Sequence, residues 1–339
     1  MAPLPSLAMV PSPGAQNQGA RGPAVRMEGL GRRFGSLWAM RGMDLELRAG
    51  EVFGLLGPNG AGKTTTVRLL TALISPSEGR AWVDGFDVRR QPEEVRRRSG
   101  ILSETPGLYD RLTALQNLDF FARLRGLDAT ERAERIERFL RLFDLWERRD
   151  DAAGTFSKGM KQKLAIARAL LHEPSVVFLD EPTASLDPEA AFVVREAIAS
   201  LRGAGRTIVL CTHNLDEAER LCDRIAFVRG ALLRVDTPAR LRDGSGGPTI
   251  RVETIDPLTE AHLAAVRATP GVVGLLSDGA APRSISLELH DLRHDAPAVV
   301  RALVEAGAGV VGVREESRSL EAVYFEVMGA RPQLEEPVA

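Results

Sequence analysis

The sequence predicts an α/β fold in which helices cover a mostly parallel sheet. Two largely apolar runs, residues 175–179 and 207–211, lack the polar alternation of a half-exposed strand, which is typical of strands buried on both faces. A third run, residues 51–56, leads into a glycine-rich turn and then into a helix predicted over residues 66–73. Strand, glycine-rich turn and helix in this order indicate a core organised around that turn.

The glycine-rich turn matches the P-loop pattern G-x-x-x-x-G-K-S/T at every fixed position. It consists of Gly57, Pro58, Asn59, Gly60, Ala61, Gly62, Lys63, Thr64 and Thr65. Glycines allow backbone N–H groups to converge on one point, and the following helix N-terminus favours an anion. Lys63 can then neutralise β- and γ-phosphates, and the Thr64 hydroxyl can ligate Mg²⁺. A purely structural turn would not require Lys and Thr at this spacing, so the motif predicts a nucleotide-phosphate site in a P-loop NTPase core.

The length and composition limit the number of domains and the class of protein that this chain can be. A chain of 339 residues is long enough for about two domains, and 44% hydrophobic and 27% charged residues are typical of a globular protein. The net charge of −2 provides no basic surface for nucleic acid. Cys211 and Cys222 have no metal-like spacing and indicate no disulfide framework, which suits a reducing cytoplasm.

The sequence contains no candidate membrane segment. No apolar run approaches the ~20 residues needed to cross a bilayer, so we expect any membrane role to come through a partner. Residues 1–24 lack the basic start and apolar core of a signal peptide, and their composition predicts a disordered tail.

Several elements flank the P-loop. Phe34 lies in a turn-like segment between two predicted strands, where it could stack on a nucleotide base, although aromatic side chains are more often buried. Residues 80–83 predict a strand and Asp84-Gly85 a hairpin turn. Helices are predicted over residues 113–125 and 129–146, and we expect them to form a helical insertion over about residues 105–170.

Carboxylates follow the second buried strand. Residues 175–179 deliver Asp180 and Glu181 at the carboxyl end of the strand, where ligands bind in open α/β sheets. Asp180 could hold Mg²⁺, and Glu181 could orient or deprotonate an attacking water. An isolated pair would be interpreted as capping the next turn, but the P-loop favours the functional interpretation.

Two further positions are candidates with structural alternatives. Ser157 is typical of the N-cap of a helix that ends at Pro174. Together with Lys158 and Gly159 it could form a second phosphate site at this helix N-terminus. Most such caps, however, are purely structural. His213 follows the strand at residues 207–211 and could donate to a γ-phosphate, but a lone histidine there is more often structural. Asn214 is predicted to start a helix, with Glu217 completing an N-x-x-E capping box.

The order of these motifs resembles the ATP-binding subunit of ABC transporters over residues 27 to about 241. Residues 57–64 resemble Walker A, residues 176–181 resemble Walker B, and residues 184–187, ending in Asp187, resemble the D-loop. His213 resembles the switch histidine and Phe34 the adenine-stacking aromatic. The family signature, usually L-S-G-G-Q, corresponds to Phe156, Ser157, Lys158, Gly159 and Met160.

The resemblance implies a mechanism that one chain cannot complete. Two ATP-binding domains dimerise head to tail, and each ATP lies between one Walker A and the other subunit's signature. Ser157 and Gly159 would donate to the γ-phosphate across the interface. Glu181 would be the general base, His213 would align γ-phosphate and water, and Asp187 would signal across the dimer. The expected cofactors are ATP and Mg²⁺, and the second subunit is expected to be another copy of this chain or a paralogous partner.

The sequence departs from the family pattern at two positions. Lys158 replaces the first signature glycine and adds a positive charge near the phosphate of the opposite subunit. Glu104 occupies the position of the Q-loop glutamine; its carboxylate could still ligate Mg²⁺ but cannot donate a hydrogen bond.

After the ATP-binding domain (residues 25–240), the chain changes character. Residues 241–248 form a glycine-rich linker, and residues 249–330 predict a small α+β domain followed by a tail at 331–339. Strands are predicted over residues 249–253, 271–276, 284–289 and 309–314, with helices over 258–268 and 297–306, an order that matches a ferredoxin-like unit. Residues 319–329 predict an amphipathic helix. We expect this domain to serve regulation or dimerisation.

With this C-terminal extension, the chain resembles the ATPases of drug- or antibiotic-exporting ABC systems, in which the permease is a separate chain. We therefore expect an ATP-hydrolysing subunit that is peripheral on the cytoplasmic face of the membrane and drives an integral membrane permease, without nucleic acid. The alternative is a soluble ABC ATPase acting on DNA or ribosomes, but such proteins typically carry paired ATPase domains, coiled-coil arms or zinc modules.

Overall fold

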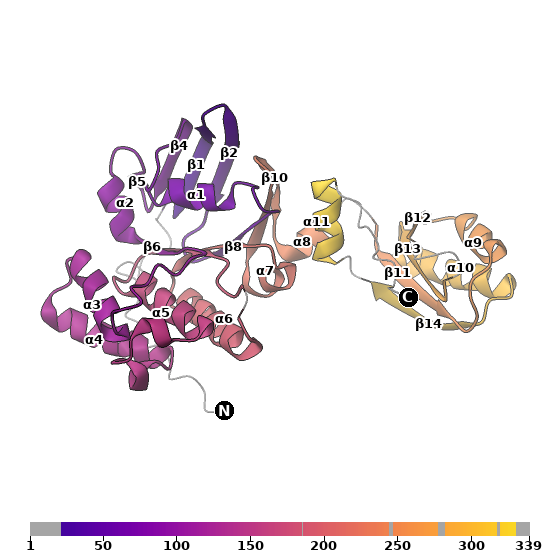
Figure 1. The fold of residues 1–339 in the computed structure, drawn as a ribbon. Helices are drawn as coiled ribbons and strands as arrows, with labels where there is room; N and C mark the ends of the chain where they lie inside the picture. The colour runs from indigo at the N-terminus through magenta and orange to yellow at the C-terminus, as the bar shows by residue number, and fades with distance from the viewer. Residues whose placement is uncertain (1–21, 185, 244–246, 277–281, 317–318, 330–339) are drawn as a thin grey trace. The chain divides into compact units, whose positions relative to one another are not determined.

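The computed structural model describes residues 22–184, 186–243, 247–276, 282–316 and 319–329, which divide into two compact units between Thr237 and Pro238 (Figure 1). The predicted tails at residues 1–24 and 331–339 lie outside the described residues, apart from residues 22–24. Of these, Ala24 is buried, and its backbone N–H donates to the Leu47 carbonyl at 2.9 Å, so the ordered sheet already includes this residue.

The first unit is built on a six-stranded sheet in the order β10-β9-β3-β8-β7-β6. Its strands are β3 (Val52–Leu56), β6 (Ser99–Leu102), β7 (Val176–Asp180), β8 (Thr207–Thr212), β9 (Arg224–Val228) and β10 (Leu232–Asp236). All neighbours run parallel except β10, which is antiparallel to β9. The apolar runs that predicted buried strands are β3, β7 and β8, and each is buried along its whole length, which confirms the α/β class.

The register of the central strands brings their carboxyl ends to one edge. Leu56 of β3 pairs with Thr212 of β8, and Asp180 of β7 pairs with Cys211 of β8. The segments that leave these strands therefore begin side by side. They carry the P-loop, Glu181 and His213.

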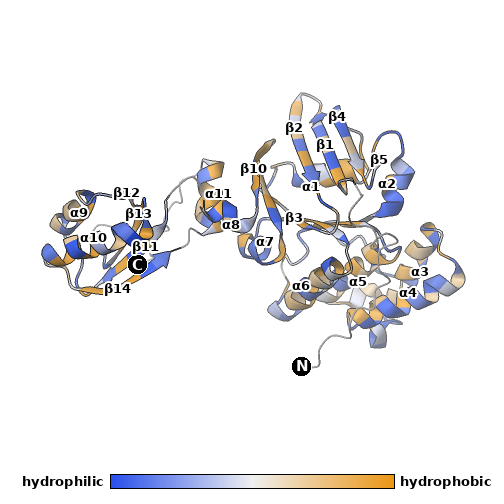
Figure 2. Cartoon of the chain, turned by 180° about the vertical axis from the view of Figure 1, so that it is seen from behind, coloured by the Kyte–Doolittle hydropathy of each residue, from blue (hydrophilic) through white to orange (hydrophobic). Residues whose placement is uncertain are grey.

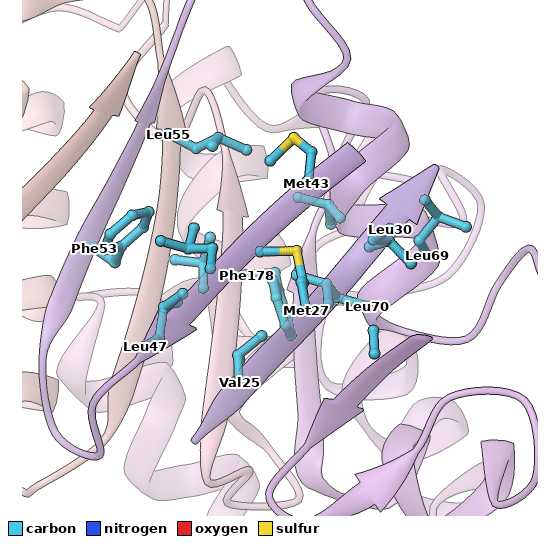
Figure 3. Packing of buried hydrophobic residues seen from close by; sticks show 14 of the residues in the cluster. Val25, Met27, Leu30, Met43, Leu47, Phe53, Leu55, Leu69, Leu70 and Phe178 are labelled. Atoms are coloured by element: carbon cyan, nitrogen blue, oxygen red, sulfur yellow. The ribbon is translucent and has the colours of Figure 1, made fainter. Parts of the chain in front are cut away.

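A four-stranded antiparallel sheet, in the order β2-β1-β4-β5, lies on one side of the core sheet (Figure 1). It contains β1 (Val25–Phe34), β2 (Leu37–Leu47), β4 (Glu78–Val83) and β5 (Phe86–Asp87). Asp84 and Gly85 have φ values of +49° and +83°, as a two-residue hairpin turn of type I′ requires, and the predicted turn is confirmed. Figure 3 shows side chains of this sheet, such as Met27 and Met43, packed in one cluster with Phe53, Leu55 and Phe178 of the core sheet.

The helices of this unit follow amphipathic sequence patterns. They are α1 (Lys63–Leu70), α2 (Pro92–Arg98), α3 (Ala114–Leu124), α4 (Ala129–Leu142), α5 (Lys158–Leu170), α6 (Pro188–Gly203) and α7 (Leu215–Leu221), with 3-10 turns at Trp146–Arg148 and Ala153–Thr155. α3, α4 and α5 lie on the side of the core sheet away from β1 and β2 (Figure 1). Figure 2 shows hydrophilic and hydrophobic residues alternating along them.

Helix boundaries differ from the predictions at two places in this unit. The predicted helix 129–146 ends at Leu142, because Phe143 is its C-cap and Asp144 adopts a left-handed φ of +56°. The P-loop helix begins at Lys63 rather than at residue 66, because the glycines end at Gly62 and the helix starts directly after them.

The second unit has the predicted β-α-β-β-α-β order. Its elements are α8 (Pro238–Asp243), β11 (Thr249–Thr254), α9 (Glu260–Arg267), β12 (Val272–Leu276), β13 (Ser284–Leu289), α10 (Leu292–Glu305), β14 (Val310–Glu316) and α11 (Leu320–Met328). The four strands form an antiparallel sheet in the order β12-β13-β11-β14, with a core of its own. No helix in the described part of the chain combines the length and apolar character needed to span a bilayer.

Two boundaries of this unit also differ from the predictions. The linker placed at residues 241–248 overlaps helix α8, whose Leu241 is fully buried, while residues 244–246 lie outside the described residues. Helix α10 begins at Leu292 rather than at Pro297, because the Asp291 carboxylate accepts from the backbone N–H groups of Arg293 and His294 and starts the helix earlier.

A partly buried histidine, His172, lies between the end of α5 and the core sheet. The Nε2–H of His172 donates to the Ser99 carbonyl at 3.0 Å. Burial, together with the positive charges of Arg125, Arg135 and Arg206, lowers the pKa of His172 to about 3. The ring is therefore neutral in the folded protein at any pH at which the protein is handled.

This histidine predicts a loss of stability in acid. Between its folded pKa and an ordinary pKa near 6.5, the unfolded chain binds a proton that the folded chain does not, so stability falls as pH is lowered through this window. Between pH 7.5 and 4.5, we expect the free energy of unfolding of the parent to fall by about 2–3 kcal/mol more than that of His172→Gln. Urea unfolding at both pH values measures it, with exposed His290→Gln as the control. A parent–variant difference that does not change with pH would contradict this assignment.

Candidate functional site

The P-loop connects β3 to α1 and cannot tolerate side chains at two of its glycines. A Cβ at Gly57 would lie 2.2 Å from the Val228 carbonyl oxygen, and a Cβ at Gly62 would lie 2.8 Å from the Ala39 carbonyl oxygen. Gly62 also has a φ of +99°, which favours glycine, and it provides no side chain to cap α1. The first N–H groups of α1 are thus left for a ligand, as suits an anion.

Lys63, the first residue of α1, is held over the loop. Its Nζ donates to the Gly57 carbonyl at 2.6 Å and to the Pro58 carbonyl at 3.2 Å, and only 7% of the residue is exposed. The ammonium group is therefore fixed beside the N-terminus of α1, where the two positive charges add. This arrangement suits a polyphosphate.

Asp180, at the end of β7, faces the next P-loop residue. The Thr64 hydroxyl donates to Asp180 Oδ2 at 2.8 Å, and Asp180 is buried. Burial raises the pKa of Asp180; the Thr64 hydrogen bond and Lys63 lower it, whereas the nearby charges of Glu181 and Glu104 raise it. A cation at this place would relieve that repulsion.

The residues present fit Mg²⁺ of the kind that binds with a nucleotide. The described residues include no group of three or more His, Cys, Asp or Glu side chains that could hold a metal by themselves. Mg²⁺ commonly uses one or two protein ligands together with phosphate oxygens and water. Thr64 and Asp180 would be those ligands, and Glu104, which lines the same cavity, is near enough to affect the charge of Asp180.

Glu181 and His213 extend the site along the sheet edge. His213 Nδ1 and Glu181 Oε1 are 2.8 Å apart, and the Thr212 hydroxyl donates to Glu181 Oε2 at 3.4 Å. The His213 side chain is 65% exposed and that of Glu181 15%. Glu181 adopts a left-handed φ of +50°, a strained conformation for a residue with a side chain. The capping interpretation of Asp180 and Glu181 is not supported, because their carboxylates face Thr64 and His213 instead.

A cavity of about 660 Å³ joins the P-loop, Asp180 and Glu181 to an aromatic end, whereas His213 does not line it. It is lined by Phe34, Leu37, Trp38, Ala39, Pro58, Asn59, Gly60, Ala61, Gly62, Lys63, Thr64, Thr65, Glu104, Asp180 and Glu181. Phe34 is 46% exposed, so the interpretation of this residue as core is wrong: it ends β1 beside the cavity, and the described residues leave its ring partly open to solvent. Leu37 and Trp38 also line this end and were missed, because an apolar residue at a hairpin gives no functional signal.

The signature segment lies elsewhere in the unit. The Ser157 hydroxyl accepts from the Met160 backbone N–H at 3.2 Å, which confirms it as the N-cap of α5, while Phe156 is buried. A Cβ at Gly159 would lie 3.0 Å from that of Ala190 and 3.9 Å from Asp187 Oδ2, so the signature packs beside the D-loop. None of residues 156–160, nor Asp187, lines the nucleotide cavity; Ser185 of the D-loop lies outside the described residues.

Gln162 was not identified from the sequence, and Glu217 was predicted to have only a capping role. Gln162 of α5 donates to the Pro182 carbonyl at 2.9 Å, and Glu217 of α7 accepts from the Thr183 hydroxyl at 2.7 Å. The predicted capping box at Asn214 is half correct: Asn214 Oδ1 accepts from the Glu217 N–H, but the Glu217 carboxylate turns away to Thr183.

Comparison with known proteins gives consistent results. A family model described as ABC transporter matches residues 40–184. The daunorubicin resistance ATP-binding protein DrrA3 of Streptomyces coeruleorubidus is 38% identical over 308 residues, covering 90% of this chain and 96% of that protein. The linearmycin resistance ATP-binding protein LnrL of Bacillus subtilis is 31% identical, covering 90% and 98%.

Solved structures resemble the first unit. The structure of an ATP-binding subunit of an ABC transporter has a TM-score of 0.61 and 33% identity, covering 65% of this chain and 92% of that one. A dimeric post-hydrolysis structure of the ATP-binding cassette MJ0796, bound to ADP and Pi, has a TM-score of 0.58 and 25% identity, covering 63% and 98%.

The geometry of the nucleotide cavity predicts how removal of the Lys63 ammonium group changes nucleotide affinity. Lys63→Ala deletes the ammonium group beside the N-terminus of α1, and we expect nucleotide affinity to fall by at least about 100-fold, since charged contacts to a buried phosphate contribute several kcal/mol. Isothermal titration with ATP and Mg²⁺ measures it. Arg267→Ala, which removes an exposed cation of α9, is the control. Parental ATP affinity in Lys63→Ala would refute the assignment.

Proposed function

The chain belongs to the ATP-binding subunits of ABC transporters, ATPases that work with a membrane permease, and from this premise we propose that it drives the export of drugs, antibiotics or related compounds. The support is that relatives matching nearly the whole chain are named for resistance to daunorubicin and linearmycin. The permease would be a separate integral membrane chain, and this subunit would be peripheral on its cytoplasmic face.

The proposed nucleotide site lies at the edge of the core sheet where the carboxyl ends of its central strands meet. Lys63 and the first N–H groups of α1 bind the phosphates, and the base stacks on Phe34 beside Leu37 and Trp38. Thr64 and Asp180, with Glu104 close by, would hold Mg²⁺, which would neutralise charge on the phosphates when bound. The hydrogen bond between Thr64 and Asp180 is the observation that carries this assignment, because it places both candidate ligands at one point.

Glu181 and His213 are proposed to carry the chemical step. Glu181 Oε1 accepts a proton from the attacking water, and the water oxygen forms a bond to the γ-phosphorus as the bond to the β-phosphate oxygen breaks. His213 donates to the γ-phosphate and keeps phosphate and water in line. The 2.8 Å separation of His213 Nδ1 and Glu181 Oε1 supports this division, since it places the two groups side by side at the edge of the cavity that Glu181 lines.

The signature requires a second subunit. Residues 156–160 do not line the cavity of their own chain, and a solved relative is dimeric. We propose a homodimer in which Ser157 and Gly159 contact the γ-phosphate on the opposite subunit. Lys158 would add a cation there, and Asp187 would contact the partner. The second unit, whose described residues carry none of the proposed catalytic groups, would support dimerisation or regulation.

Replacement of the proposed base separates binding from hydrolysis. Glu181→Gln retains a side chain of the same shape but cannot accept the proton from water, so we expect turnover to fall by roughly 10²–10⁴-fold with ATP binding preserved. Steady-state phosphate release and ATP titration measure the two quantities, and size-exclusion chromatography with ATP should show a trapped dimer. Exposed Glu196→Gln on α6 is the control. If Glu181→Gln hydrolyses ATP at the parental rate, Glu181 is not the base.

The transporter assignment is tested by recovering the permease. We expect the Glu181→Gln chain, purified from its native host in mild detergent with ATP and Mg²⁺, to carry a polytopic membrane protein in fixed stoichiometry. Adding this protein in vesicles should change the ATPase rate of the parent chain. Recovery of nucleic acid or ribosomal proteins without a membrane protein would instead place the chain among the soluble ATPases of the family.

A further inference from the structure

The stretch that carries Glu181 is held by two helices that contribute nothing to the nucleotide cavity. Gln162 Nε2 of α5 donates to the Pro182 carbonyl at 2.9 Å. The Thr183 hydroxyl donates to Glu217 Oε1 of α7 at 2.7 Å. Gln162 and Glu217 are 6% and 4% exposed; the hydrogen bond of Gln162 is buried and that of Glu217 is partly buried. The two residues after Glu181 are thus each fixed by a different helix.

The hydrogen bond to Glu217 closes a ring that returns to Glu181. The Glu217 N–H donates to Asn214 Oδ1, and the Asn214 N–H donates to Thr212 Oγ1, both at 3.0 Å. The Thr212 hydroxyl donates to Glu181 Oε2 at 3.4 Å. Since Thr183 is two residues from Glu181, the ring links the segment after β7 to the segment after β8. Within this ring, Glu217 makes the link to Thr183 through a buried carboxylate.

The backbone of Glu181 shows why such bracing is needed. Its φ of +50° is unfavourable for a non-glycine residue, and such conformations persist only where surrounding contacts fix them. One backbone hydrogen bond, from the Glu181 N–H to the Cys211 carbonyl at 2.8 Å, anchors the start of the stretch. The hydrogen bonds of Gln162 and Glu217 anchor the next two residues of the chain.

Capping alone does not explain Glu217. Asn214 already caps α7, and Glu217 Oε2 is buried without a hydrogen-bond partner among the described residues. Burial raises the pKa of Glu217 although hydrogen bonds with Thr183 and Thr212 lower it, so the charged form of this carboxyl group is disfavoured here. A residue of low polarity would suit the packing better if packing were its only role.

We propose that Glu217 and Gln162 are positioning residues for the catalytic carboxylate: their bonds to Thr183 and Pro182 hold Glu181 at the angle from which it reaches the attacking water beside His213. This inference rests on the proposed role of Glu181. It predicts that loss of either bond lowers kcat while nucleotide binding, which depends on the P-loop, is retained.

The test is a double-mutant cycle between Thr183 and Glu217. Thr183→Val and Glu217→Met each leave one polar partner alone, and we expect each to lower kcat by roughly 10–100-fold, with KM and ATP affinity within about threefold of the parent. Glu217→Gln retains an acceptor for the Thr183 hydroxyl and should keep kcat within about threefold. Gln162→Leu should lower kcat like Thr183→Val. Thr71→Val, which removes a fully buried hydroxyl from the end of α1, is the matched control.

The double variant Thr183→Val/Glu217→Met separates positioning from stability. Replacing both partners by apolar groups of similar shape should bring the melting temperature back towards that of the parent, while kcat stays at the level of the single variants. If kcat recovers together with the melting temperature, or if Thr183→Val turns over at the parental rate, the inference is overturned. A parental rate in Glu181→Gln would overturn the proposed base itself, so the two failures are distinguishable.

Discussion

The parallel register of β3, β8 and β7 is the constraint on which the rest of this site depends. Each strand ends where its chemistry begins, so one ladder of backbone hydrogen bonds sets the distances between three segments far apart in sequence. The 2.8 Å contacts between Thr64 and Asp180 and between His213 and Glu181 are consequences of this register. A slip of one strand by one residue would turn all of its side chains to the other face and would break these contacts.

The sheet edge gathers like charges that the protein cannot neutralise alone. Asp180, Glu181 and Glu104 lie close enough for their charges to raise the pKa of Asp180, and burial adds to this effect. Lys63 and the N-terminus of α1 provide positive charge, but the ammonium group is directed to the loop carbonyls of Gly57 and Pro58. A phosphate and a divalent cation that arrive together would satisfy both sets of groups, so the proposed site suits the pair better than either member alone.

Whether a feature can be predicted from the sequence depends on whether a local residue pattern or a contact between distant residues determines it. The P-loop was predictable because its chemistry is contained in residue types at fixed spacing, and the buried strands because both faces are apolar. Phe34 was ambiguous, since a hairpin aromatic carries no sign of whether another layer covers it. The contacts of Gln162 and Glu217 were not predicted because their partners are 20 and 34 residues away and are chosen by tertiary packing. The start of α10 and the helix α8 were misplaced because caps and short helices depend on contacts that periodicity does not show.

The separation of signature and cavity within one chain favours a symmetric assembly. A two-fold axis places the signature of each subunit at the cavity of the other, so one contact surface completes two sites at once. An open head-to-tail arrangement would leave an incomplete site at each end. In this chain the signature also packs beside Asp187, and Gln162, on the helix that Ser157 caps, reaches the Pro182 carbonyl next to Glu181. A partner's phosphate that binds at the start of α5 would therefore act on the helix that braces this subunit's own base, which gives the two sites of the proposed dimer a direct mechanical connection.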